Sequence, residues 1–529
     1  MVIRKSLQAI ARCHLSVAAM AFFRAAAAKL KAFFSDKKNI RALIIASAHA
    51  LITLIILSRH EIWSDEAHVW LQLKYKTLAE LFRYSMGEGH PFLFHAILFP
   101  FVKIGFSMNF VRIFCWLSSS AGIFFFIRYA PFGGWLKASV LLSSPFLYFF
   151  PVFSRSYALI PLFLFAAGAV YPLRHSHSIL YVSILLCLAS SHFLMTLPAM
   201  FLLAVFFADS YKKLSFSVFK YCFVIALAVF FFLYFQADAA FNENQFYNIS
   251  YKGDISVMLD FLQSFFSCFT EYFVTEEYTM KFGLLMNAGY LFSVFFIAAL
   301  LFFLFYLSPK YYAGAFIALV AHFFIYFFVY PLVYPVRAYC FSSFLLFLFW
   351  LAFSDLKCGG KLTKNIVFKR RMSEILLCAF FAMSIPTGLR MAVYDIFRPF
   401  SSAAEMADYI RNNVPEDAVI FSVTNFIESL IYNLPDREIL NQDKQPLKYT
   451  LNYGDYYYTK EDFIPYLDKG QRIYVLYNWN ADIYEKGLPG YSTKLAIKNR
   501  ETFVLCEYYA ERFFYGPPLP DSLRNKSKL

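Results

Sequence analysis

Charged residues are scarce in this sequence, and apolar residues dominate it. Only 16% of the 529 residues are Asp, Glu, Lys or Arg, whereas 60% are hydrophobic and 21% are aromatic. Soluble globular domains have a charged fraction of about 25% and a smaller apolar share. The composition therefore excludes an ordinary soluble domain and predicts a polytopic membrane protein.

Closely spaced cysteines and histidines of the kind that form disulfides or bind metals are also missing. The nine Cys are scattered, mostly in apolar segments, with no CxxC pair and no spacing typical of metal ligands. Such a pattern indicates no disulfide framework and no metal site. His90 and His95 are the closest pair of candidate ligands in the first polar segment, but they lack the i, i+4 spacing of a helical zinc site. We therefore predict no bound metal from the sequence.

The net charge of +14 comes largely from short basic runs between apolar segments, at residues 37–38, 212–213 and 369–371. This distribution is typical of cytoplasmic loops of membrane proteins. A nucleic-acid-binding protein would instead present a continuous basic surface to the phosphates. We expect membrane lipids and no nucleic acid as partners.

The first 39 residues carry eight Lys and Arg side chains among Ala, Leu and Phe, and no small-residue cleavage site follows. A secretory signal is therefore not expected. We predict a basic N-terminal segment on the cytoplasmic side, either as a helix lying on the membrane or as a flexible leader.

One short segment decides the predicted topology. Residues 90–105 are apolar but contain Pro91, Pro100 and Lys103. Counting them as a span would move the later basic runs to the outer side, against the positive-inside tendency. We therefore expect this segment to lie on the outer surface, with eleven spans in total. The predicted spans are 40–58, 110–128, 135–152, 156–173, 178–191, 193–208, 216–235, 283–307, 312–332, 338–354 and 374–392.

This topology divides the chain into three parts: the N-terminal segment 1–39, a membrane module at 40–399 and a C-terminal domain at 400–529. The module has long outer loops at 59–109 and 236–282. The C-terminal part is predicted to be a small extracytoplasmic α/β domain, since a helical pattern and three short apolar runs are separated by turn residues. The helix is expected at 405–412 and the strands at 418–423, 472–478 and 502–508.

Polar residues gather at the outer ends of the predicted spans. In an apolar protein such residues are costly beside the bilayer unless they serve a polar site. We expect them to surround one site at the outer membrane surface. The first loop supplies Asp65, Glu66, Glu88 and His90, and later corners supply Arg155, Tyr157, His192, Arg337 and Tyr339.

These side chains suit transfer from an anionic lipid carrier. A carboxylate can take the proton of an incoming hydroxyl, and we predict this role for Asp65. Glu66 is the second predicted catalytic residue, either orienting Asp65 or binding the acceptor. Arg155, Arg337 and His192 are the candidate ligands of the donor phosphate, because Arg and His donors stabilise the charge on a departing phosphate. The candidate substrate-binding residues are Glu88, His90, Tyr157 and Tyr339.

Each residue also has a simpler interpretation. An Asp-Glu pair in the first turn of a helix stabilises that helix. An Arg at the end of a span is often an interfacial anchor. A single His is often a packing residue. These alternatives remain open at the level of the sequence.

Four short motifs together resemble the GT-C superfamily of polyprenyl-phosphate-sugar-dependent glycosyltransferases, especially bacterial relatives of protein O-mannosyltransferases and of the aminoarabinose transferase. They are Trp63-Ser-Asp-Glu-Ala67, Glu88-Gly-His-Pro91, Ser154-Arg-Ser-Tyr-Ala158 and Ser191-His192. The likeness covers residues 40 to 240, and later spans match in architecture alone. Phe92 departs from the superfamily pattern, in which a second Pro often follows His-Pro.

The resemblance implies inverting transfer of a sugar from a polyprenyl phosphate to an acceptor outside the cytoplasm, in a bacterial inner membrane. Asp65 matches the catalytic aspartate of the superfamily. Some members use a divalent metal and others do not, so a metal cofactor is left open. A transporter or lipid-linked-sugar flippase is the alternative, together with a non-catalytic assembly protein. A transporter would place charges near the membrane midplane, within repeated halves.

Overall fold

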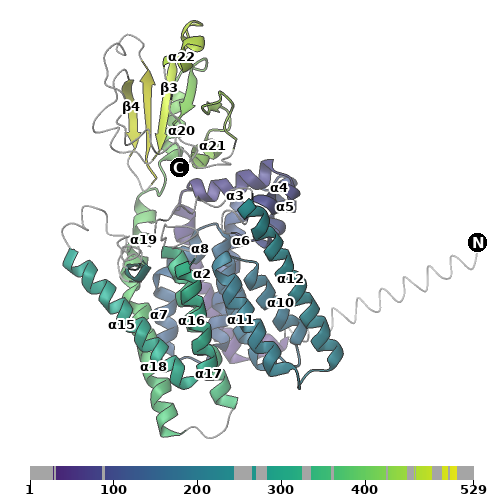
Figure 1. Ribbon diagram of the computed structural model, residues 1–529. Helices are drawn as coiled ribbons and strands as arrows, with labels where there is room; N and C mark the ends of the chain where they lie inside the picture. The colour runs from purple at the N-terminus through teal and green to yellow at the C-terminus, as the bar shows by residue number, and fades with distance from the viewer. Residues whose placement is uncertain are drawn as a thin grey trace, which may run out of the picture.

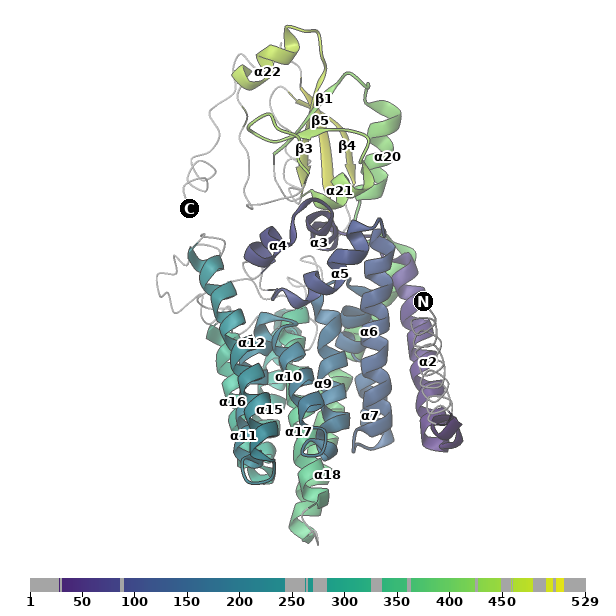
Figure 2. The ribbon, with the colours of Figure 1, turned by 90° about the vertical axis from the view of Figure 1, so that its right-hand side faces the viewer.

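The computed structural model describes residues 28, 31–85, 90–242, 262, 265–269, 283–324, 335–358, 363–423, 427–448, 458, 460–478, 491–497 and 501–508. Glu88, residues 1–27 and most of the predicted loop 236–282 lie outside these ranges. A bundle of long helices forms the body of the molecule, and a small sheet domain covers one end of it (Figures 1 and 2).

The bundle is built from apolar helices joined by short turns. Three short helical turns, η1 (Pro145–Phe149), η2 (Ser156–Ala158) and η3 (Tyr171–Leu173), interrupt or extend them. The α-helical elements of the bundle are α2 (Lys37–Arg59), α6 (Met108–Tyr129), α7 (Gly134–Leu142), α8 (Phe150–Val152), α9 (Leu159–Val170), α10 (Ser178–Ala189), α11 (Phe193–Ser210), α12 (Phe216–Asn242), α15 (Gly283–Leu307), α16 (Pro309–Phe324), α17 (Pro335–Cys358), α18 (Lys364–Met383) and α19 (Ile385–Phe397).

Among the described residues, eight helices are long and apolar enough to cross a membrane, and the bent segment 134–152 would be a ninth. The sequence predicts eleven spans. The remaining two predicted spans are helical but shorter, since α10 has 12 residues and the described α16 has 16. At 1.5 Å per residue, about 20 residues are needed to cross a hydrocarbon core of about 30 Å. The predicted fold class, a polytopic helical membrane protein with a small α/β domain, is confirmed.

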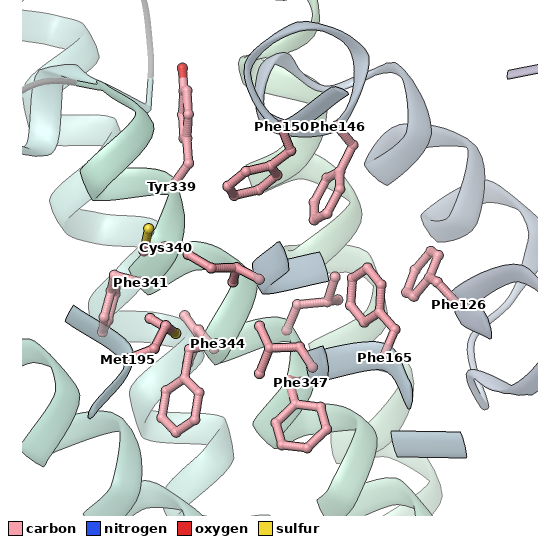
Figure 3. Close-up of a cluster of buried hydrophobic side chains, with 14 of the residues drawn as sticks. Phe126, Phe146, Phe150, Phe165, Met195, Tyr339, Cys340, Phe341, Phe344 and Phe347 are labelled. Carbon is pink, nitrogen blue, oxygen red and sulfur yellow. The ribbon is translucent and has the colours of Figure 1, made fainter. Parts of the chain in front are cut away.

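Helix α17 is the centre of the bundle, with 94% of its apolar stretch buried. Phe residues from α6, η1, α8, α9 and α17 pack together around it (Figure 3). Two glycines allow the close packing of these helices. A Cβ on Gly122 of α6 would lie 2.5 Å from the Pro161 backbone of α9, and one on Gly168 of α9 would lie 2.8 Å from the Trp350 ring of α17. The aromatic content of the sequence therefore fills a dense core.

Three helices follow α2 and precede α6 in the chain. They lie at the end of the bundle that faces the sheet domain (Figure 2). They are α3 (Ser64–Tyr75), α4 (Leu78–Ser85) and α5 (Leu93–Lys103). They lie within the segment 59–109 that the sequence predicts as an outer loop. With 11 residues, α5 is only about 17 Å long, too short to cross the bilayer. The loop therefore covers one end of the bundle.

The C-terminal domain is a five-stranded sheet with the order β2-β1-β3-β5-β4. Strands β1 and β3 are parallel, whereas β5 pairs antiparallel with β3 and β4. The predicted helix and the three predicted strands are present, and the two strands that the sequence did not predict, β2 and β4, form the sheet edges. The elements are α20 (Ala403–Asn413), β1 (Val419–Ser422), α21 (Glu428–Asn433), β2 (Ile439–Leu440), α22 (Lys460–Leu467), β3 (Ile473–Asn478), β4 (Tyr491–Ile497) and β5 (Phe503–Tyr508).

Candidate active site

Asp65 lies in the first turn of α3, directly above the bundle. Its partner is Arg155, which lies in the break between α8 and η2. One guanidinium nitrogen, Nη1, donates to the Asp65 carbonyl oxygen at 2.6 Å and lies 3.3 Å from the Asp65 carboxylate. The Asp65 side chain is 30% exposed, whereas that of Arg155 is 10% exposed. The carboxylate is therefore anchored by a buried cation and still open to an incoming group.

The same guanidinium contacts His90. Its Nη2 atom donates to Nε2 of the imidazole, and Nδ1 lies 2.8 Å from the Ser156 hydroxyl. Burial, followed by the charge of Arg155, holds the pKa of His90 well below its usual range. His90 is therefore neutral and accepts at Nε2, which leaves the proton on Nδ1 to donate to Ser156.

His192 and Tyr157 form the next layer of the cluster. The two rings stack with centroids 4.4 Å apart, and His192 lies 5.1 Å from the His90 ring. Nδ1 of His192 accepts from the Leu194 backbone N–H at 3.1 Å and so caps α11. Burial, then the charge of Arg337, lowers the pKa of His192 well below its ordinary value. The ring is therefore neutral, and its Nε2–H is the remaining donor.

Arg337 approaches the cluster from α17, and its Nε donates to the Tyr157 hydroxyl at 3.3 Å. The cluster thus contains one carboxylate, two guanidinium groups and two neutral imidazoles, so its cations outnumber its anions. An excess of fixed cationic and N–H donors beside a carboxylate is suited to an anionic ligand such as a phosphate ester.

Glu66 points away from this cluster into a buried network. Its Oε1 accepts from the Ser154 backbone N–H at 2.6 Å, and its Oε2 lies 3.0 Å from Nε2 of His60. Nδ1 of His60 lies 2.7 Å from Asp395 of α19, whose carboxylate also accepts from Tyr148. Glu66 is fully buried, and these contacts favour a role in holding α3 in place.

The two carboxylates control the charge of His60. Burial alone would lower the pKa of His60, but Glu66 and Asp395 outweigh it and raise the pKa to about 9. Burial likewise acts to raise the pKa of Glu66, and His60 reverses that effect, so the net pKa is lowered. The network therefore holds a protonated imidazole between the carboxyl groups of Glu66 and Asp395. Its charges are paired and hydrogen-bonded, as buried ions require.

Of the predicted substrate-binding residues, one lies outside the described part of the chain and another packs away from the cluster. Glu88 lies outside the described residues. Tyr339 is buried in the core of the bundle, where its hydroxyl donates to the Cys268 carbonyl at 2.9 Å and its ring packs on Phe149 (Figure 3). These contacts place Tyr339 in the helix packing, on a different side of α17 from Arg337.

Ser156, His60 and Asp395 were not predicted from the sequence. Ser156 stands between Arg155 and Tyr157 in a motif that the sequence analysis did select, so the motif itself carried the signal. His60 and Asp395 are 335 residues apart and become neighbours only through the packing of α19 on α2. Within the described ranges, no three His, Cys, Asp or Glu side chains lie close enough together to hold a metal ion.

No family model matches the chain, and no curated protein matches it either. Among the solved structures that are similar to it are two of one protein. Both are crystal structures of ArnT from Cupriavidus metallidurans, one bound to undecaprenyl phosphate and one in the apo state. The identity is 14% and 13%, the TM-score is 0.47 in each case, and each match covers 90% of this chain and 99% of ArnT. This likeness concerns the backbone fold alone and assigns no activity to the chain.

Proposed function

We propose that this protein is an integral membrane glycosyltransferase that moves a sugar from a polyprenyl-phosphate carrier to an acceptor outside the cytoplasm. The observation that carries the proposal is the position of Arg155, whose guanidinium contacts both Asp65 and His90. A phosphate ligand beside a partly open carboxylate is what transfer from a phosphate-linked donor requires. The motifs around these residues are also those that resemble the GT-C superfamily.

In the proposed reaction, the acceptor hydroxyl attacks the anomeric carbon of the sugar on the side opposite the phosphate, which inverts that carbon. The Asp65 carboxylate takes the hydroxyl proton as the new C–O bond forms. The bond from the anomeric carbon to the phosphate oxygen breaks, and its electron pair leaves with the polyprenyl phosphate. Arg155, Arg337 and the Nε2–H of His192 stabilise the charge that develops on that phosphate.

We infer that this end of the bundle faces away from the cytoplasm. The basic residues Arg128, Lys212 and Lys213 lie at the opposite end, where α6 ends and α11 turns into α12 (Figure 2). Short basic loops are typical of the cytoplasmic side. The proposed site and the C-terminal domain would then share the outer compartment, with the N-terminal end of α2 inside.

The proposal is tested with the purified full-length chain in liposomes. A panel of polyprenyl phosphates that carry a hexose, a pentose or an aminopentose is supplied with candidate acceptors, and released polyprenyl phosphate is measured by mass spectrometry. We expect release from one donor class, coupled to sugar on an acceptor. Movement of the intact lipid-linked sugar across the bilayer, with no release from any donor, would instead establish the flippase alternative.

A further inference from the structure

The first turn of α3, which carries Asp65, is held from two sides. On one side, the neighbouring residue Glu66 accepts from the Ser154 backbone of the helix bundle. On the other side, Ser64 donates to the carboxylate of Glu501 in the C-terminal domain, through its backbone N–H at 3.1 Å and through its hydroxyl. The two residues that flank Asp65 in the chain are thus fixed by different domains.

Glu501 lies just before β5 and is fully buried. One carboxylate oxygen accepts both bonds from Ser64, and the other accepts from the Ser401 hydroxyl. The Glu501 backbone also pairs with the linker that enters the domain, since its N–H donates to the Phe400 carbonyl at 3.1 Å and its carbonyl accepts from Ser402 at 3.1 Å. A single side chain therefore connects the first turn of α3 to the linker and to the sheet.

A second contact lies one turn further along the same face of α3. His68 lies 3.0 Å from Glu428 of α21, and both side chains are buried. The Ser64 hydroxyl also lies 3.1 Å from that of Ser429. Residues 64 and 68 are four apart and share one face of the helix. These contacts place that face against α21, and α3 and α21 lie beside each other in both views of the molecule (Figures 1 and 2).

The linker itself packs on the residues before α3. The Phe400 ring lies 5.5 Å from Trp63 and 5.2 Å from His60. Asp395, in the last turn of α19, pairs with His60, which in turn pairs with Glu66. The segment that leads from α19 into the C-terminal domain therefore contacts residues before Asp65 directly, and it is connected to Glu66, after Asp65, through His60.

We propose that the C-terminal domain completes the catalytic unit and that Glu501 is a positioning residue for Asp65. The inference rests on the proposed transferase function. A carboxylate is the fitting partner for the free N–H groups of a helix N-terminus. Removing it would leave the buried Ser64 N–H without its acceptor and the Ser64 hydroxyl with the Ser429 hydroxyl as its contact, and the first turn would shift. A misplacement of about 1 Å at a reacting group can cost about 100-fold in rate.

Substitutions at Glu501 should affect the catalytic rate and not the affinity for the donor. The donor phosphate ligands Arg155, His192 and Arg337 all belong to the helix bundle, whereas Glu501 contacts Ser64, the residue before Asp65 in the chain. Substitution at Glu501 should therefore lower kcat and leave the donor KM unchanged. A general loss of folding would instead lower the active fraction and spare the kcat of the molecules that remain folded.

The test compares E501A, E501Q and the control E507Q in the full-length protein. Glu507 is a buried carboxylate on β5 that pairs with Arg472 at 3.2 Å, on the sheet and away from α3. We expect E501A to lower kcat at least about 10-fold, with a donor KM within about 2-fold of wild type. E501Q keeps one acceptor oxygen for Ser64, so its kcat should lie between those of E501A and wild type. E507Q should retain wild-type kcat.

Hydrogen exchange separates a failure of this inference from a failure of the proposed function. In E501A, exchange should quicken at the amides of residues 64–67 and stay unchanged in α6 and α9. This readout holds whether or not any donor is turned over. If wild type turns over no donor, the transferase function is contradicted. The exchange result still tests whether Glu501 holds the first turn of α3. Unchanged exchange at 64–67, wild-type kcat in E501A, or an equal kcat loss in E501A and E507Q would overturn the inference.

Discussion

Arg155 holds Asp65 at two points, since the same nitrogen donates to the Asp65 carbonyl at 2.6 Å and lies 3.3 Å from the carboxylate. Its second terminal nitrogen contacts His90. The planar guanidinium group makes all three contacts at once, which a single ammonium group does not. The proposed base and the proposed phosphate ligand are therefore positioned together.

Replacing Arg155 with Lys keeps the positive charge and removes this fork. We expect R155K to retain its folded structure and to lose about 100-fold in kcat/KM, because one ammonium group can serve either Asp65 or the donor phosphate. The matched control is R128K. Arg128 pairs with Asp36 at 2.8 Å at the opposite end of the bundle and is partly exposed. Equal activity in R155K and R128K would contradict this role of Arg155.

His192 has two functions that different substitutions separate. Its Nδ1 atom caps α11, and its Nε2–H is the proposed donor to the phosphate. Asn is an effective N-cap residue, so H192N should keep the bond to Leu194 and stay within about 1 kcal/mol of wild type in stability. Its KM for the donor should nevertheless rise several-fold. H192A loses the cap as well, at a further cost of about 1 kcal/mol. Wild-type KM in H192N would show that Nε2 does not serve the donor.

The charge of His60 makes stability depend on pH. Because the pKa of His60 is raised from 6.5 to about 9 in the folded protein, the folded state holds the proton more tightly than the unfolded state. This stabilisation is fully present below about pH 6.5 and is lost as the pH rises through about 9. The difference in Tm between wild type and H60Q should therefore be largest near pH 6 and should shrink near pH 9.5. A constant difference across this range would mean that His60 is not charged between Glu66 and Asp395.

Membrane orientation is tested with single cysteines in a background without the nine native Cys. Ser107 and Asn412 are exposed at the end that carries the site and on the C-terminal domain, and Ser215 is exposed at the opposite end. We expect an impermeant thiol reagent added outside intact cells to label S107C and N412C and to spare S215C. Labelling of S215C alone would invert the orientation and place the site in the cytoplasm.

The sequence was informative where polar residues stood out against an apolar background. Asp65, His90, Arg155 and His192 were selected as polar residues at the outer ends of spans, and the structure brings them into one cluster. Tyr339 was grouped with Arg337 because the two are close in the chain. Residues two apart on a helix point about 200° apart. Arg337 therefore reaches the cluster while Tyr339 packs into the core.

The contacts that hold α3 could not be predicted from sequence patterns, because their partners are far apart in the chain. Ser64 and Glu501 are 437 residues apart, and His60 and Asp395 are 335 apart. A His or Asp next to an apolar segment has the pattern of an interfacial anchor, and only tertiary packing shows that these two form a buried pair. Composition alone does not give helix length: the apolar run 178–191 has the composition of a span, whereas its helix, α10, has 12 residues.

The central claim is that Asp65 takes the proton of the acceptor, and the most direct measurement is single-turnover transfer by D65N. The carboxylate is partly exposed, and its Asn replacement is nearly the same shape, so the variant should fold and bind the donor as wild type does. We expect the rate of sugar transfer to fall about 100- to 10,000-fold, with polyprenyl phosphate binding unchanged. Transfer by D65N at the wild-type rate would contradict the account.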